Sequence, residues 1–107
     1  MKFALAKTLV LLQFMTPPLS SAEEPGDVAA GFSYADANCS QCHAVEKDYI
    51  ESPISNAPTF QALSNKPELT GMALAVLLQT PHRDMPDFVI QPGDRNNIIA
   101  YILSLKQ

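Results

Sequence analysis

The most restrictive feature of this chain is the five-residue stretch Cys39-Ser40-Gln41-Cys42-His43. Two thiols three positions apart lie on the same face of a helical turn. The spacing, with a histidine directly after the second thiol, is typical of c-type haem attachment. Each thiol can form a thioether along one porphyrin edge, and the next residue can bind the iron. The motif therefore predicts one covalently bound haem c, with Cys39 and Cys42 as attachment points and His43 as an axial ligand.

Residues 1–22 have the pattern of a secretory signal peptide. Lys2 and Lys7 supply positive charge, the apolar run 8–15 follows, and small residues precede the expected cleavage point. The alternative is an uncleaved anchor, but a membrane span needs about 20 apolar residues, far more than this run contains. We therefore expect export to the periplasm, cleavage, and a single domain over residues 23–107 that has no stable membrane insertion.

The charge of the predicted mature chain is acidic. The formal net charge of the whole chain is −4, and loss of the two signal-peptide lysines makes it −6. The remaining basic residues are scattered singly along the sequence: Lys47, Lys66, Arg83, Arg95 and Lys106. Without a basic patch to neutralise phosphates, nucleic-acid binding is excluded as an expected function. An acidic surface instead favours association with a basic partner.

Apolar periodicity predicts an all-α domain with long loops. Asp27 is suited to cap a helix that runs from about Val28 into the haem motif. Further helices are expected at 59–64, at 67–79 and at 94–105. No segment alternates convincingly with the period of two that a half-buried strand requires.

The second axial ligand of the iron has three candidates. Met72 lies with Val76 on the apolar stripe of the predicted helix 67–79, so we expect it in the core. Met85 lies in a charged, proline-flanked loop, where a thioether has no packing role but could bind iron. His82 precedes it in the same loop and is expected to be an exposed, neutral histidine, although it remains the competing ligand. We predict Met85, paired with His43.

Four stretches of this sequence resemble the class I cytochromes c, of the small bacterial periplasmic type. They are Gly31 with the motif 39–43, Asn-Ala-Pro-Thr-Phe at 56–60, His-x-x-Met-Pro at 82–86, and Ile-Ala-Tyr-Ile-Leu-Ser-Leu at 99–105. The resemblance covers most of the predicted mature chain. It implies the class I cytochrome c fold, in which three to five helices with long loops wrap around one covalently bound haem.

The resemblance also implies specific contacts. Gly31 and Tyr101 would mark the crossing of the first and last helices, and the helix at 67–79 would cover the haem. A proline carbonyl in the 53–58 loop, with Pro58 preferred to Pro53, would accept a hydrogen bond from Nδ1 of the histidine ligand.

One position departs from the family pattern. Ala35 stands where many members carry an aromatic residue, four positions before the first cysteine. Phe32 or Tyr34 are the candidates to replace that aromatic contact.

Together these features predict a soluble, monomeric, periplasmic electron carrier and no enzyme. Redox partner proteins would dock transiently at the haem edge through a small interface. Three alternatives remain open: a haem-based sensor in which Met85 dissociates, a peroxidase that uses His82 for acid–base chemistry, and a thiol oxidoreductase without haem. The last requires a nearby βαβ pattern, which the sequence lacks.

Overall fold

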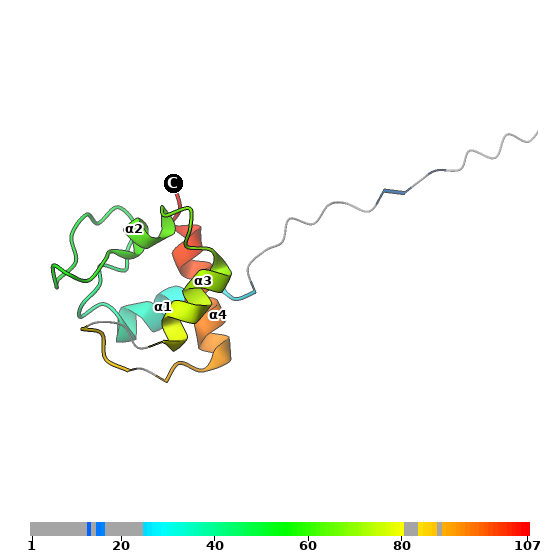
Figure 1. The fold of residues 1–107 in the computed structure, drawn as a ribbon. Coiled ribbons are helices and arrows are strands. Elements are labelled where there is room, and N and C mark those ends of the chain that lie inside the picture. Colours follow the sequence, from blue (N-terminus) through cyan, green and yellow to red (C-terminus); the bar gives the residue numbers. More distant parts are fainter. Residues whose placement is uncertain (1–12, 14, 17–24, 81–83, 88) are drawn as a thin grey trace, which may run out of the picture.

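The structure is a computed structural model that describes residues 13, 15–16, 25–80, 84–87 and 89–107. Across these residues it contains four helices and no strand (Figure 1), namely α1 (Val28–Asn38), α2 (Phe60–Ser64), α3 (Gly71–Gln79) and α4 (Pro92–Ser104). The predicted all-α fold with three to five helices is confirmed. The predicted signal peptide falls almost wholly outside the described residues, so its cleavage remains a prediction.

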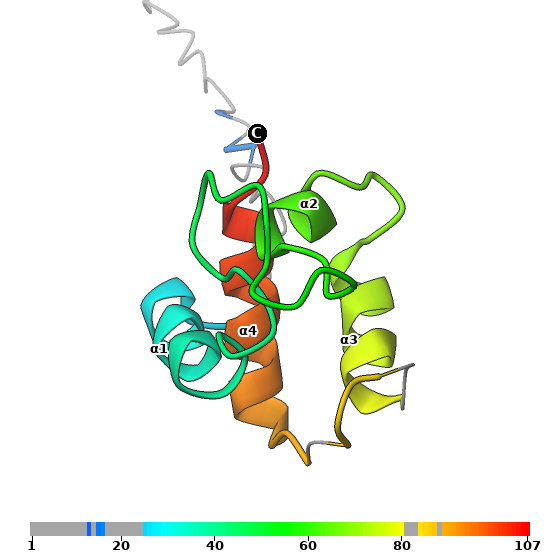
Figure 2. The same cartoon turned by 90° about the vertical axis from the view of Figure 1, so that its left-hand side faces the viewer.

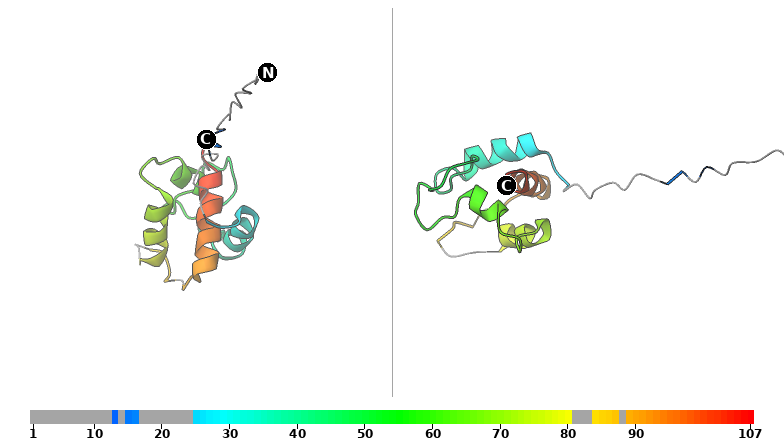
Figure 3. Two further views of the ribbon diagram at one scale, coloured as in Figure 1. Left: turned by 90° about the vertical axis from the view of Figure 1, so that its right-hand side faces the viewer. Right: turned by 90° about the horizontal axis from the view of Figure 1, so that it is seen from above.

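Helix α4 is the centre of the fold. It lies between α1 and α3 (Figure 2, Figure 3), and it also contacts α2. Ile98 and Ile102 of α4 are the largest apolar side chains that are fully buried. Within the described part of the chain, no helix is long and apolar enough to cross a membrane.

Helices α1 and α4 cross with their backbones in close contact. A Cβ atom added at Gly31 would overlap the Asn97 carbonyl oxygen and would lie 2.8 Å from the Tyr101 Cβ atom. The predicted crossing at Gly31 and Tyr101 is therefore confirmed. The Phe32 ring packs at 5.3 Å from the Tyr101 ring, so Phe32 supplies the aromatic contact that the buried Ala35 cannot.

The first and second helices begin where the sequence predicts. The side chain of Asp27 accepts a hydrogen bond from the Ala30 amide at 2.8 Å, and Thr59 caps α2 in the same way. The prediction that the first helix continues into the haem motif is wrong, because α1 ends at Asn38 and Cys39 is its C-cap.

The third and fourth helices begin at other residues than predicted. Helix α3 begins at Gly71, not at 67, because the Thr70 hydroxyl accepts from the Ala73 amide at 3.2 Å and caps the helix there. Residues 66–69 form a separate turn. Helix α4 begins at Pro92, two residues before the predicted start, since a proline fits the first helical position without an amide donor.

The predicted core position of Met72 is wrong. Its side chain is 81% exposed, and that of Val76 on the same stripe is 57% exposed, whereas Leu74 is 2% exposed. Leu78, one turn after Leu74, also packs against the core. Because α3 carries apolar side chains on every side, the periodicity could not identify the face that meets α4.

Candidate haem site

The two thiols lie on a turn that directly follows α1. The Cys39 amide donates to the Ala35 carbonyl at 2.7 Å and closes the last turn of the helix. The Cys39 carbonyl then accepts from the amides of Cys42, at 3.3 Å, and His43, at 3.0 Å. Both cysteines are free and half-buried. The motif is therefore held as one helical turn, which is the arrangement that two thioethers to one porphyrin edge require.

The imidazole of His43 is oriented by two contacts. Its Nδ1 lies 2.6 Å from the Pro58 carbonyl oxygen, and the Phe60 ring lies 5.4 Å away at a tilt of 51°. Since a carbonyl oxygen can only accept, Nδ1 carries the proton and donates it. The lone pair is consequently on Nε2, the nitrogen that remains available to a metal. The predicted contact with Pro58 is present.

The loop after the motif returns to it through its backbone. The Ile54 amide donates to the Cys42 carbonyl at 3.2 Å, and the Ser52 hydroxyl accepts from the Ala44 amide at 3.0 Å. The Phe60 amide donates to the Ala44 carbonyl at 2.9 Å. Residues 43–45 and 58–60 therefore lie together, and we call these two segments the His43 support. The sequence carries no signal for the part played by Ser52.

The environment of Cys39 opposes a role in thiol–disulfide exchange. Burial, and next the neighbouring Cys42 thiol, raise the pKa of Cys39 from an ordinary value of 9.0 to about 11. Reactive cysteines of oxidoreductases have a lowered pKa, because the thiolate is the attacking species. A thiol that stays protonated at neutral pH is a poor nucleophile for redox exchange.

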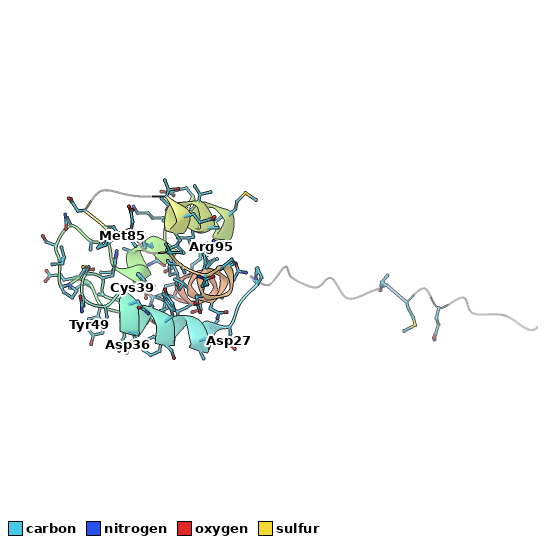
Figure 4. All side chains as sticks on the ribbon, turned by 90° about the horizontal axis from the view of Figure 1, so that it is seen from below. Asp27, Asp36, Cys39, Tyr49, Met85 and Arg95 are labelled. Atoms are coloured by element: carbon cyan, nitrogen blue, oxygen red, sulfur yellow. The ribbon has the colours of Figure 1, made fainter. Side chains whose placement is uncertain are left out.

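Met85 lies in the described segment 84–87, opposite α1. It is half-buried, and Figure 4 shows it on the side of the domain away from α1, whereas Cys39 lies at the end of that helix. Asp84 adopts a left-handed backbone conformation with φ of 62°. The Asn56 amide group donates to the Asp84 carboxylate at 3.2 Å and joins this segment to the loop that contains Pro58. His82, the competing ligand, lies outside the described residues.

The donor set fits a covalently bound haem. Two free thiols share one turn, the adjacent imidazole presents Nε2, and a thioether lies on a segment linked to the loop of Pro58. Four helices and this set of donors define a small haem-binding domain in which the chain supplies both attachment points.

Comparison with known proteins identifies the family. No family model and no solved structure matches the chain. The chain is similar to cytochrome c-552 of Bradyrhizobium diazoefficiens, with 30% identity over 87 residues, which cover 81% of this chain and 83% of that protein. The chain belongs to the class I, monohaem cytochromes c. As a member of this family it carries haem c and is an electron carrier rather than an enzyme.

Proposed function

We propose that this protein is exported by residues 1–22 and carries single electrons in the periplasm, with its haem iron bound by His43 and Met85. The observation that carries the proposal is the hydrogen bond from Nδ1 of His43 to Pro58, because it leaves Nε2 available to iron. When bound, haem supplies a one-electron couple between ferric and ferrous iron. Transfer is outer-sphere, so no substrate needs to enter the site.

The residues around the iron would tune its reduction potential. A thioether paired with an imidazole favours reduced iron and raises the potential. The Pro58 carbonyl acts in the opposite direction, since a hydrogen bond from Nδ1 makes the imidazole of His43 a stronger donor. Cys39 and Cys42 hold the porphyrin edge at the end of α1, which fixes the haem relative to both ligands.

The partners of a monomeric carrier of this kind would be basic redox proteins. A hollow of about 430 Å³ beside His43 is lined by three carboxylate side chains, those of Asp36, Glu46 and Glu51, and by no lysine or arginine among the described residues. Together with the acidic charge of the chain, this favours association with a positively charged surface. Electron exchange with such partners should slow as the salt concentration rises.

Two methionine variants test the ligand assignment. Met85→Ala should abolish the long-wavelength charge-transfer band of methionine bound to ferric iron, and should lower the reduction potential. Met72→Ala is the matched control, because its side chain is 81% exposed, and we expect an unchanged spectrum and potential. A Met85→Ala protein that keeps the band would refute the assignment. Met72→Ala should then remove the band, whereas a wild-type protein without the band would point to His82.

A second candidate function is a haem-based sensor in which Met85 dissociates. The observation that favours it is the weak attachment of the described segment 84–87, where the Asn56–Asp84 hydrogen bond is exposed. Carbon monoxide distinguishes the two functions. Slow or negligible binding to the ferrous protein supports the carrier, and rapid binding supports the sensor.

A further inference from the structure

Tyr101 of α4 contacts both segments of the His43 support. Its hydroxyl donates to the Val45 carbonyl with an Oη–O distance of 2.6 Å, and its ring lies 6.5 Å from the Phe60 ring. Tyr101 is 7% exposed and Val45 is 4% exposed, so this hydrogen bond is shielded from water. Helix α4 is therefore tied to a residue only two positions after His43.

The two segments of the support cannot move independently. The Phe60 amide bonds to the Ala44 carbonyl at 2.9 Å, while the Phe60 ring packs against the His43 ring. The Pro58 carbonyl, two residues before Phe60, receives the Nδ1 proton. A shift of Val45 relative to α4 would therefore change the alignment of the imidazole with that carbonyl.

The hydroxyl of Tyr101 stays protonated and can therefore act as a hydrogen-bond donor over the physiological pH range. Burial, and then the nearby carboxylates of Glu46 and Asp36, raise the pKa of Tyr101 above its ordinary value of 10.0. The group therefore keeps its proton over the physiological pH range. The Tyr101 ring packs separately against Phe32, and the Tyr101 Cβ atom lies close to Gly31 of α1. Loss of the oxygen alone would thus leave the helix crossing in place.

We infer that Tyr101 is a positioning residue for His43, whose hydroxyl, through Val45, holds the imidazole against the Pro58 carbonyl. The inference rests on the proposed role of His43 as an axial ligand. A well-aligned Nδ1 hydrogen bond makes the imidazole a stronger electron donor and stabilises ferric iron. Loosening the support should weaken this donation, so the reduction potential should rise.

The test uses Tyr101→Phe in the haem-containing protein. This variant keeps the ring and removes the hydroxyl. We expect a higher reduction potential and a several-fold faster hydrogen exchange of the His43 Nδ1 proton, measured by NMR. An unchanged potential together with unchanged exchange would overturn the inference.

Two control variants separate positioning from general stability. Asp27→Ala removes the cap of α1, at the end of that helix far from Cys39, and should lower stability without changing either readout. Tyr49→Phe removes the hydroxyl of a side chain that is 55% exposed, and should change neither stability nor the readouts. If Asp27→Ala changes the potential and the exchange as much as Tyr101→Phe does, the role of Tyr101 is only structural and the inference fails.

A further variant keeps the inference testable if Tyr101→Phe does not yield holoprotein. Ser52→Ala removes the acceptor of the Ala44 amide and should shift both readouts in the same direction by a smaller amount. If neither the potential nor the exchange rate changes in this variant, the inference is contradicted. The ligand role is tested separately in the wild-type protein, where hyperfine-shifted ring protons of His43 are expected. Their absence would refute the proposed ligation and not the role of Tyr101 in the support.

Discussion

The two sides of the haem site differ in what holds them. On the His43 side, the Nδ1–Pro58 hydrogen bond is exposed, but the Tyr101–Val45 hydrogen bond that supports the same segment is buried beside the crossing of α1 and α4. On the Met85 side, α3 exposes Met72, the Val89 side chain is 90% exposed, and the segment 84–87 is joined to the Pro58 loop by an exposed hydrogen bond. The chain itself therefore builds the His43 side, whereas the Met85 side depends more on the haem.

The physical reason for this difference is access of water. A buried hydrogen bond has no competing water partner, and breaking it leaves two polar groups unsatisfied. An exposed hydrogen bond can be exchanged for one to water at little cost. Segments with few buried contacts open at low free energy. We therefore expect the proposed Met85 ligand to leave the iron before the proposed His43 ligand when the protein is heated or made alkaline.

Removal of both thiols should have the largest effect. In a Cys39→Ala, Cys42→Ala protein no thioether can form, so covalent haem should be absent in a pyridine haemochrome assay. We expect reduced helicity by far-UV circular dichroism, with hydrogen-exchange protection lost in α3 before it is lost in α1 and α4. Ser40→Ala, between the thiols, should retain haem. A haem-free variant that keeps full helicity and protected α3 amides would show that the Met85 side does not depend on the haem.

The second largest effect is expected from Gly31→Ala. The new methyl group would overlap the Asn97 carbonyl, and the crossing must shift, which should cost about 2–3 kcal/mol in the free energy of unfolding. Urea denaturation measures it. The matched control is Gly93→Ala in α4, where an added Cβ meets nothing within 4 Å. In this control the free energy of unfolding should change by no more than about 1 kcal/mol. Equal losses in the two variants would mean that the crossing is not tightly packed.

Alkaline pH should destabilise the His43 side through Tyr101. The folded protein holds the pKa of Tyr101 above the ordinary value of 10.0, so well below pH 10 the hydroxyl is protonated in both states, and its contribution to stability is complete and does not vary with pH. Above pH 10 the unfolded chain loses the proton first. Stability then falls as pH rises, by at most about 1.4 kcal/mol per pH unit.

Tyr101→Phe should remove the part of the alkaline loss of stability that comes from Tyr101. Urea denaturation on both sides of pH 10 measures the slope. The pKa of Tyr34 is also raised, chiefly by burial, so some decline should remain in the variant. Identical slopes in the wild type and the variant would contradict the prediction.

The smallest effect is expected from Asn56→Ala, on the Met85 side. The lost hydrogen bond to Asp84 is exposed, so the free energy of unfolding should change by at most about 0.5 kcal/mol. The methionine charge-transfer band should nevertheless disappear at a slightly lower temperature. Asn65→Ala, which removes an exposed hydrogen bond to Gln107, is the control and should leave that temperature unchanged. An effect of equal size in both variants would show that the Asn56 contact does not hold the Met85 segment.

Local sequence patterns predicted the features that depend on neighbouring residues. The turn of Cys39–His43 follows from i, i+3 spacing, and the cap at Asp27 follows from a side chain that can bond a nearby amide. The closeness of Gly31 to α4 also agrees with the sequence, because a missing Cβ is useful only where another backbone approaches. The turn and the cap need few distant contacts to form, whereas at Gly31 the sequence indicated only that another backbone lies close.

The tertiary structure alone decided which apolar surface is buried. Met72 and Leu74 are equally suited to a core by residue type, yet only Leu74 meets α4, since packing against a particular neighbour selects the face of an apolar helix. The hydrogen bond between Tyr101 and Val45 joins residues 56 positions apart and has no local signal. The sequence by itself thus determined the cofactor and the residues proposed to attach it, because the whole motif lies in one turn. The His43 support and its contact with Tyr101 were decided by the tertiary structure, because the two segments of the support and Tyr101 come from three separate parts of the chain.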